Sequence, residues 1–355
     1  MSELTDSIVV DTTKRIFGDL CDPQTVNAAT DDAWKSQLWS ALEENGLTLT
    51  WIPEDRGGVG ASMADGFDVI RVAGQYAEPI ALSETLLAGW LLARAGQNIE
   101  ANGALTIAPT RYDESIQYDG SKLSGTARAI PYAKDARQIV VFAEMGAANV
   151  IAIVSPADCK MVDRNANLGG ERYDVTFDSI APVEIYDLPS WLTRDVFNWL
   201  GAAVRSAQMT GALETILAIS TQYAQEREAF GRTISKFQAV QHNLAELGGE
   251  VAAALAASGS AADTVDREAD NHDALFLEIA SAKIRIGEAA NKGAAIAHQV
   301  HGAIGYTGEH ILQRFTRRMW GWRDDFGSEA EWAVELGNFV AREGADELWP
   351  KLAAR

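Results

Sequence analysis

The chain has 355 residues, of which 47% are hydrophobic and 23% charged, an ordinary balance for a globular protein with room for two or three compact units. Its formal net charge of −20 argues against non-specific nucleic-acid binding, which needs a basic surface, and against docking on anionic membranes. Two cysteines, Cys21 and Cys159, are too few for a disulfide framework.

Residues 1–103 have the apolar spacing of helices. Trp34, Leu38 and Leu42 recur at intervals of four, and residues 66–96 continue the helical period. The first residues lack the basic start and apolar stretch of a signal peptide, and no uninterrupted apolar run approaches the roughly 18 residues of a membrane span. We therefore expect an N-terminal helical domain in a cytoplasmic protein that makes no membrane contact.

Residues 104–189 have a different texture, with six short β-branched runs separated by Gly, Asp, Asn and Pro. Such a pattern predicts a small antiparallel barrel or sandwich, shorter than most β domains of this kind. From residue 190 to 355 the helical period returns, and small residues between 280 and 297 allow close helix contact. The last region is therefore predicted to be a four-helix bundle, and the fold class is α+β.

Three motifs stand in this frame. They are "WIPEDRGGVGAS" at 51–62, "REAFGRTISKFQ" at 227–238 and "QVHGAIGYTGEH" at 299–310. In their order and spacing they resemble the motifs of the acyl-CoA dehydrogenase family, and the likeness extends over nearly the whole chain. The predicted order of helices, β domain and bundle is also the architecture of that family.

The resemblance implies an FAD enzyme that desaturates an acyl-CoA thioester between Cα and Cβ. A carboxylate would remove the α proton while the β hydrogen leaves as hydride to the flavin, with electron-transfer flavoprotein as the acceptor. In the family, the matching positions contact the adenine and pyrophosphate of an FAD held mainly by a neighbouring subunit, and a serine approaches the flavin. Here these positions are Arg227, Phe230, Gln238, Gln299, Gly302 and Ala303, with Ser328 on the flavin side.

The chain departs from the family where the chemistry takes place. Phe326 occupies the usual position of the catalytic glutamate, and Gly201 occupies the alternative position on a helix ahead of the "REAFG" signature. The nearest remaining carboxylates are Asp325 and Glu329. The loop that holds the flavin ring is also missing from residues 105–125, where Thr110 and Ser115 are the nearest hydroxyl groups.

These losses are similar to those of the short, base-less subunits of heteromeric α2β2 acyl-CoA dehydrogenases of actinobacterial steroid side-chain catabolism. The resemblance therefore implies a subunit that completes the FAD site of a second acyl-CoA dehydrogenase chain, acting on an acyl-CoA in steroid side-chain or lipid degradation. Two alternatives remain open: a self-sufficient homo-oligomeric dehydrogenase with a displaced carboxylate base, and a flavin-free scaffold on the same fold.

Two further groups need an interpretation. His298 and His301 have the spacing of a metal pair on a helix, but no third ligand is evident, so we expect no metal site. Arg314, Arg317 and Arg318 form a basic cluster that either pairs with Glu309 or Asp324, or contacts a partner subunit or an acyl-CoA phosphate. We expect Asp324 and Asp325 to face solvent or this cluster.

Overall fold

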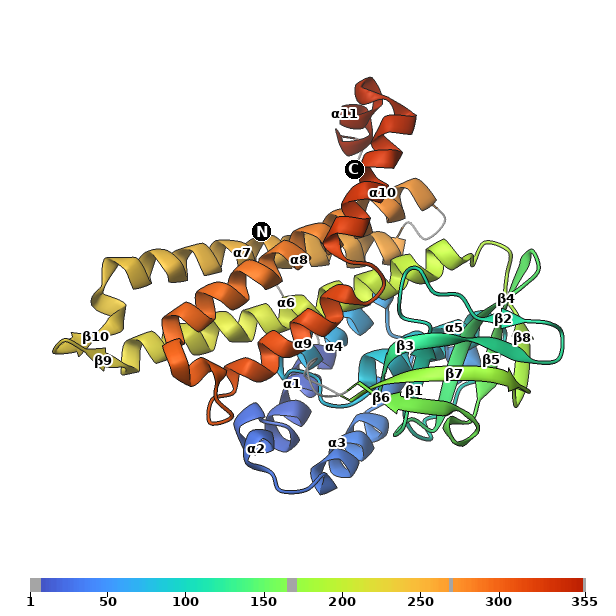
Figure 1. Cartoon of the computed structure of the whole chain (residues 1–355), viewed down its shortest axis with the longest axis horizontal. Helices are drawn as coiled ribbons and strands as arrows, with labels where there is room; N and C mark the ends of the chain where they lie inside the picture. The colour runs from blue at the N-terminus through green and yellow to red at the C-terminus, as the bar shows by residue number, and fades with distance from the viewer. Residues whose placement is uncertain (1–7, 165–170, 268–270, 354–355) are drawn as a thin grey trace.

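The computed structural model describes residues 8–164, 171–267 and 271–353 (Figure 1). Five helices form the N-terminal region: α1 (Ile8–Leu20), α2 (Pro23–Ala28), α3 (Ala33–Glu44), α4 (Met63–Gln75) and α5 (Leu82–Arg94). Helix α4 begins at a capping box in which Ser62 and Asp65 satisfy each other's backbone N–H groups. Helix α5 is buried along nearly its whole length, which explains why its sequence is apolar all round.

The middle region is an eight-stranded sheet. Its strands are β1 (Leu105–Ala108), β2 (Gln117–Tyr118), β3 (Leu123–Pro131), β4 (Gln138–Met145), β5 (Ala148–Val154), β6 (Lys160–Asp163), β7 (Arg172–Ile180) and β8 (Glu184–Asp187). The strand order is β6-β7-β3-β2-β4-β5-β8, and β1 also pairs with β4. The antiparallel expectation is wrong for two pairs, because β1 and β2 both run parallel to β4. The sequence did not predict strands β2 and β6, because strands of two and four residues are too short to show an alternation of apolar and polar side chains.

Three long helices and a shorter one build the C-terminal bundle: α6 (Arg194–Glu226), α7 (Gln238–Arg267), α8 (His272–His301) and the 13-residue α9 (Leu312–Asp324). A Cβ on Gly211 of α6 would lie 1.9 Å from the carbonyl oxygen of Arg71 on α4, so only glycine permits that close approach. A small hairpin, β9 (Glu228–Ala229) and β10 (Arg232–Thr233), joins α6 to α7 at one end of the bundle (Figure 1). Helices α10 (Glu329–Glu343) and α11 (Ala345–Ala353) project from the other end. Short 3-10 turns occupy residues 47–49, 54–56, 156–158, 234–236 and 302–306.

The order of N-terminal helices, sheet and helical bundle confirms the predicted α+β fold class. The N-terminal helices and the bundle share one hydrophobic core, while the sheet encloses a second core of its own. The strands begin at Leu105 and end at Asp187, so we propose the same division into residues 1–103, 104–189 and 190–355. Within the described residues, no helix combines the length and apolar character that crossing a bilayer requires.

Candidate functional site

Phe326 and Gly201, the two positions at which the resemblance places a base, lie against each other. Phe326 follows α9 and is fully buried. A Cβ built on Gly201 of α6 would lie 2.4 Å from the Phe326 ring, so the ring takes the space that a side chain at residue 201 would need. Phe197 of α6 meets the Phe326 ring edge-on, with the two ring centroids 5.6 Å apart. The place where Phe326 and Gly201 meet is therefore apolar, and neither residue can accept a proton.

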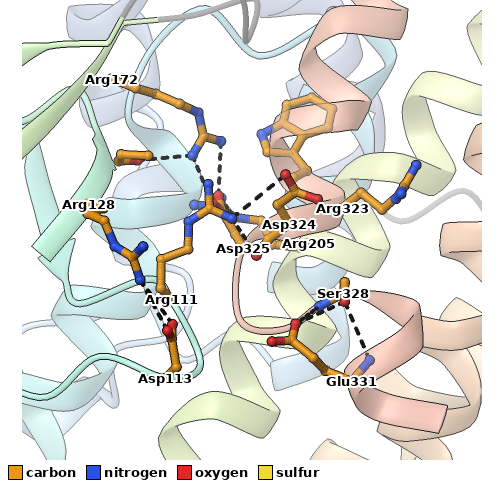
Figure 2. Close-up of polar contacts among 12 residues, drawn as sticks. Arg111, Asp113, Arg128, Arg172, Arg205, Arg323, Asp324, Asp325, Ser328 and Glu331 are labelled. Atoms are coloured by element: carbon orange, nitrogen blue, oxygen red, sulfur yellow. Dashed lines mark hydrogen bonds and ion pairs between the residues drawn. The ribbon is translucent and has the colours of Figure 1, made fainter.

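Asp325 is buried completely in an ion-pair network (Figure 2). Its carboxylate accepts two hydrogen bonds from Arg172 of β7, at 2.8 and 2.9 Å, and one from Arg205 of α6 at 3.0 Å. Arg205 also pairs with Glu84 of α5 at 2.8 Å. Burial by itself would raise the pKa of Asp325, but the two guanidinium groups outweigh it and lower the pKa to about 2. The expectation that Asp325 faces solvent or the arginine cluster of α9 is wrong, since two arginines from other elements hold it inside.

Such an Asp325 has little capacity as a base, because each carboxylate oxygen is engaged and its low pKa makes it a weak proton acceptor. The other displaced candidate, Glu329, is half-buried at the start of α10, where its carboxylate lies 3.0 Å from Arg323. Ser328 forms the N-cap of the same helix in a capping box with Glu331 (Figure 2). Both residues therefore have local partners that stabilise the start of α10.

The segment after β1 bridges the junction between the sheet and the bundle at Phe326. The Phe326 N–H donates to the carbonyl oxygen of Thr110 at 2.7 Å, and Arg111 donates to the carbonyl oxygen of Asp324 at 2.9 Å (Figure 2). The Thr110 hydroxyl is buried and has no hydrogen-bond partner in the described part of the chain, whereas Ser115 is exposed. Direct contacts thus bridge the sheet and the bundle where the resemblance would place the flavin ring, and a cavity of about 570 Å³ lined by Arg111, Tyr112 and Asp324 adjoins them.

The residues expected at the adenine and pyrophosphate end lie at the opposite end of the bundle. Tyr223, near the end of α6, stacks on His301 at the end of α8 with ring centroids 4.5 Å apart, which brings the two helix ends together. All of the following are exposed there: Arg227, Phe230, Gln238, Gln299, Gly302 and Ala303. Phe230 is 96% exposed and has a left-handed backbone with φ of 54°. A large aromatic side chain held in solvent on a strained hairpin is typical of a binding surface.

Ser328 does not join this group. Its neighbour Glu329 contacts α8 at Gly287, and Gln299 is 12 residues farther along the same helix. At the rise of an α-helix this is a separation of about 18 Å. The structure therefore brings six of the seven expected cofactor contacts to one end of the bundle and leaves Ser328 near Phe326.

His298 and His301 also lie at this end of α8, both buried. His298 stacks on Tyr306 and its Nε2 lies 3.1 Å from the hydroxyl of Thr316, while His301 bonds the Ala297 carbonyl oxygen. Among the described residues, no group of three or more His, Cys, Asp or Glu side chains is placed to hold a metal ion. The pair packs against aromatic rings instead.

Comparisons with known proteins agree with this geometry. Residues 198–323 match the family described as "Acyl-CoA dehydrogenase, C-terminal domain". Acyl-CoA dehydrogenase IpdE2 of Mycobacterium tuberculosis (strain ATCC 25618 / H37Rv) is 28% identical over 305 residues, covering 84% of this chain and 86% of that protein. The chain is therefore similar to acyl-CoA dehydrogenases over most of its length. This likeness classes it with the acyl-CoA oxidoreductases.

Solved structures of this family share the fold over nearly the whole chain. A chain of the ChsE4-ChsE5 complex from Mycobacterium tuberculosis superposes with a TM-score of 0.84 at 21% identity, covering 97% of this chain and 99% of that chain. A chain of the structure titled "Tcur3481-Tcur3483 steroid ACAD G363A variant" gives a TM-score of 0.81 at 22% identity, covering 94% of this chain and 97% of that chain.

The fold family implies an FAD, and the two ends of this chain fit that group differently. At the hairpin end, the exposed Phe230 ring and the Arg227 guanidinium suit a base and a phosphate. The backbone at Gly302 has a positive φ of 65° and nothing within 4 Å of where a Cβ would stand, so it is open to a ligand. At Phe326 the chain fits a flavin ring poorly, because Thr110 and Arg111 bond the end of α9 directly and the adjoining cavity of about 570 Å³ is lined mainly by charged side chains.

Sequence reasoning missed the residues that occupy the interior beside Phe326. Arg205 and Glu84 are buried at 1% and 2% exposure, and both interrupt apolar helical stretches in the sequence. A charged residue in such a stretch is a signal, since charges are fully buried only when paired. Lys283 is also fully buried and donates to the carbonyl oxygens of Trp322, Arg323 and Asp325 at 2.8–3.0 Å, which holds the end of α9.

Proposed function

We propose that this chain is the base-less subunit of a heteromeric acyl-CoA dehydrogenase. In this assembly it contributes the adenine and pyrophosphate contacts of an FAD whose flavin ring and catalytic base belong to a partner chain. The complex desaturates an acyl-CoA thioester and passes the electrons to electron-transfer flavoprotein. The observation that carries this proposal is the packing of Phe326 on Gly201, since both family positions for the base are apolar and fill each other's space.

The location of the expected FAD contacts supports the same role. They are exposed at the hairpin end of the bundle, where a partner chain has free access to them, while the junction at Phe326 is bridged by Thr110 and Arg111 and bordered by charged side chains. A chain that presents one end of a cofactor site and lacks the other is suited to complete a site on another subunit. Phe230 gives this surface a large aromatic ring that would otherwise be costly to leave in water.

The self-sufficient alternative is less well supported. It requires Asp325 or Glu329 as the base, yet Asp325 is enclosed by two arginines and Glu329 is paired with Arg323. A flavin-free scaffold would have no need for an exposed, strained Phe230 between an arginine and a glycine turn. For the acyl group we propose a steroid side-chain thioester, supported by the structural likeness to a protein whose title names a steroid acyl-CoA dehydrogenase.

The test compares flavin content with and without a partner. The chain is purified alone and after co-expression with a longer acyl-CoA dehydrogenase chain that carries the missing glutamate, and the visible spectrum and subunit ratio are measured. We expect no flavin on the chain alone, and two flavins for each α2β2 tetramer together with acyl-CoA oxidation. The matched control is the partner chain alone, which should hold less flavin than the complex. Flavin and acyl-CoA oxidation in the isolated chain would contradict the proposal.

A further inference from the structure

A polar cavity lies away from the site described above, between α2, α3 and the N-terminal half of α9. Its volume is about 380 Å³. Arg314, Arg317 and Arg318 all line it, at the i, i+3 and i+4 positions that put three side chains on one helix face. Tyr132, which follows β3, forms part of the opposite wall. Three guanidinium groups thus converge on one hollow in a chain whose formal net charge is −20.

The expected ion pairs of this cluster with Glu309 or Asp324 are absent from the ion pairs of the described residues. Arg314 and Arg318 have no carboxylate within 4.0 Å there; Arg318 donates to the Tyr132 hydroxyl at 2.6 Å and lies over its ring. Burial and the like charge of Arg318 lower the pKa of Arg314, as expected for a half-buried cation without a counter-charge. Leaving such a charge uncompensated is unfavourable, so the arrangement indicates a binding role.

Carboxylates on the far side of the cavity are already engaged. Lys35 pairs with Asp32 at 3.0 Å and with Glu171 at 2.8 Å, and Asp31 accepts the backbone N–H of Ala33. These acids are thus engaged by partners on α3, and the charge of Arg318 also helps to lower the pKa of Glu171, so Arg314 is the less compensated of the two cations. The positive charge that remains belongs to the α9 side of the hollow.

We propose that this cavity binds the phosphate group of a small molecule. A phosphate ester carries about −1.5 to −2 charges at neutral pH, which matches two cations without an ion-pair partner within 4.0 Å among the described residues, Arg314 and Arg318. Guanidinium forks match its several oxygens with paired N–H donors. A carboxylate supplies one charge and two oxygens and fits the cluster less well.

An adjoining cavity offers room for the rest of such a molecule. Its volume is about 540 Å³, and it shares four lining residues with the first cavity, Asp32, Lys35, Pro79 and Tyr132. Trp39 and Ile80 add apolar surface there. The two hollows together suit a phosphate ester with an apolar or aromatic body, and the inference is independent of the flavin site.

Calorimetric titration of the full chain with inorganic phosphate, in a buffer free of other multivalent anions, tests the proposal. We expect saturable binding at one site, at least tenfold weaker binding by Arg314→Gln, and intermediate binding by Arg314→Lys, which keeps the charge and loses the fork. Arg94→Gln is the matched control, because Arg94 is exposed, lies over Trp90 and is outside both cavities. No saturable binding, or equal binding by the Arg314→Gln variant, would overturn the inference.

Thermal unfolding provides a second readout that a merely structural arginine would not give. In phosphate-free buffer Arg314→Gln should raise the melting temperature, since it removes an uncompensated cation beside Arg318. Phosphate should stabilise the unmodified chain and leave the variant unchanged. A lower melting temperature of the variant without phosphate would contradict the uncompensated charge on which the inference rests.

The source of the phosphate is distinguished with coenzyme A and its dephospho form. If the 3′-phosphate of coenzyme A occupies the cavity, coenzyme A binds at least tenfold tighter than dephospho-coenzyme A, and Arg314→Gln removes the difference. Equal binding of both, with inorganic phosphate still bound through Arg314, assigns the cavity to a free phosphate ester. Neither the phosphate titration nor the coenzyme A comparison depends on flavin. A negative result in them would therefore overturn the phosphate site and leave the proposed subunit role, which is tested by flavin content, unaffected.

Discussion

Asp325 and Phe326 are neighbours in the chain but have opposite chemistry. The Phe326 ring packs on Gly201 and Phe197, whereas the Asp325 carboxylate binds two arginines. The same buried network reaches farther, because Arg205 bonds Gln208, and Gln208 donates to Glu78. At the residue scale, the region beside the missing base is therefore an ionic interior, and its charges have stability consequences of their own.

Glu78 makes one of these consequences measurable. Burial, together with the nearby charge of Glu84, raises the pKa of Glu78 from 4.5 to about 7. Its folded-state pKa lies above the unfolded value, so its stabilising contribution is complete below about pH 4.5 and is lost as the pH rises to 7. We expect Glu78→Gln to remove this loss: the variant should gain stability relative to the natural chain over this window, by at most about 1.4 kcal/mol per pH unit.

Urea unfolding of both chains at pH values from 4.5 to 8 measures this difference. Glu44→Gln, at an exposed glutamate of α3, is the control and should leave the pH profile unchanged. A constant difference between Glu78→Gln and the natural chain across the whole range would show that Glu78 does not titrate in this window.

At the scale of elements, the β9–β10 hairpin has an unusual design for a connection between two helices. It contains Phe230 in a left-handed conformation, directly before Gly231, and the ring meets Phe237 edge-on at 6.2 Å while staying almost fully exposed. The sequence predicts a helix break here, because Gly231 interrupts the apolar period. What the sequence could not indicate is the exposure of Phe230, since an aromatic residue beside apolar helices is normally read as core.

Phe230→Ala should separate binding from stability. Because the ring is exposed, we expect a change of less than about 0.5 kcal/mol in the free energy of unfolding. In the co-expressed complex, loss of a stacked base should weaken FAD binding by about 1–3 kcal/mol, seen as a flavin content at least fivefold lower after dialysis. Trp349→Ala on α11, which removes another exposed aromatic, is the control and should keep the flavin. An unchanged flavin content in Phe230→Ala would argue against the proposed site.

At the scale of the whole molecule, Arg172 connects the sheet to the bundle. It lies on β7, donates to the Ala129 carbonyl oxygen of β3 and binds Asp325 after α9 (Figure 2). Arg172 and Asp325 are 153 residues apart in the chain, and Arg205 and Asp325 are 120 apart. Contacts at such separations have no local signature, which explains why the sequence predicted the order of helices, sheet and bundle but not the burial of Asp325.

Replacement of Arg172 tests this connection. Arg172→Met leaves a fully buried carboxylate with one fewer partner, so we expect a loss of about 3–5 kcal/mol in the free energy of unfolding. Arg164→Met is matched to it, because Arg164 pairs with Asp174 at 2.7 Å on the surface of the same sheet, and should change stability by less than about 1 kcal/mol. Denaturation followed by circular dichroism gives both values. Equal effects of the two variants would mean that the buried pair does not secure the junction.

The motifs of the candidate site were more predictable than its surroundings. Positions 326 and 201 could be located by counting from glycine landmarks, because the spacing between Gly305 and the end of α9 sets which residue arrives at the junction. The bridging of that junction by Thr110 and Arg111 depends on the fold of a segment with no regular period. The sequence therefore predicted that the site lacks a base, and the structure showed which residues contact the end of α9 there.

The contact between Phe326 and Gly201 has a consequence for the history of the chain. A carboxylate cannot return at position 201 while the ring is present, because any side chain there would meet it at 2.4 Å. Shrinking the ring first opens a cavity in the core, at a cost of about 3–5 kcal/mol. The return of a carboxylate at position 201 thus begins with a destabilised intermediate. Because the two residues fill one space, position 201 cannot regain a carboxylate without a change at Phe326, and in the subunit role that we propose the chain would evolve together with its partner.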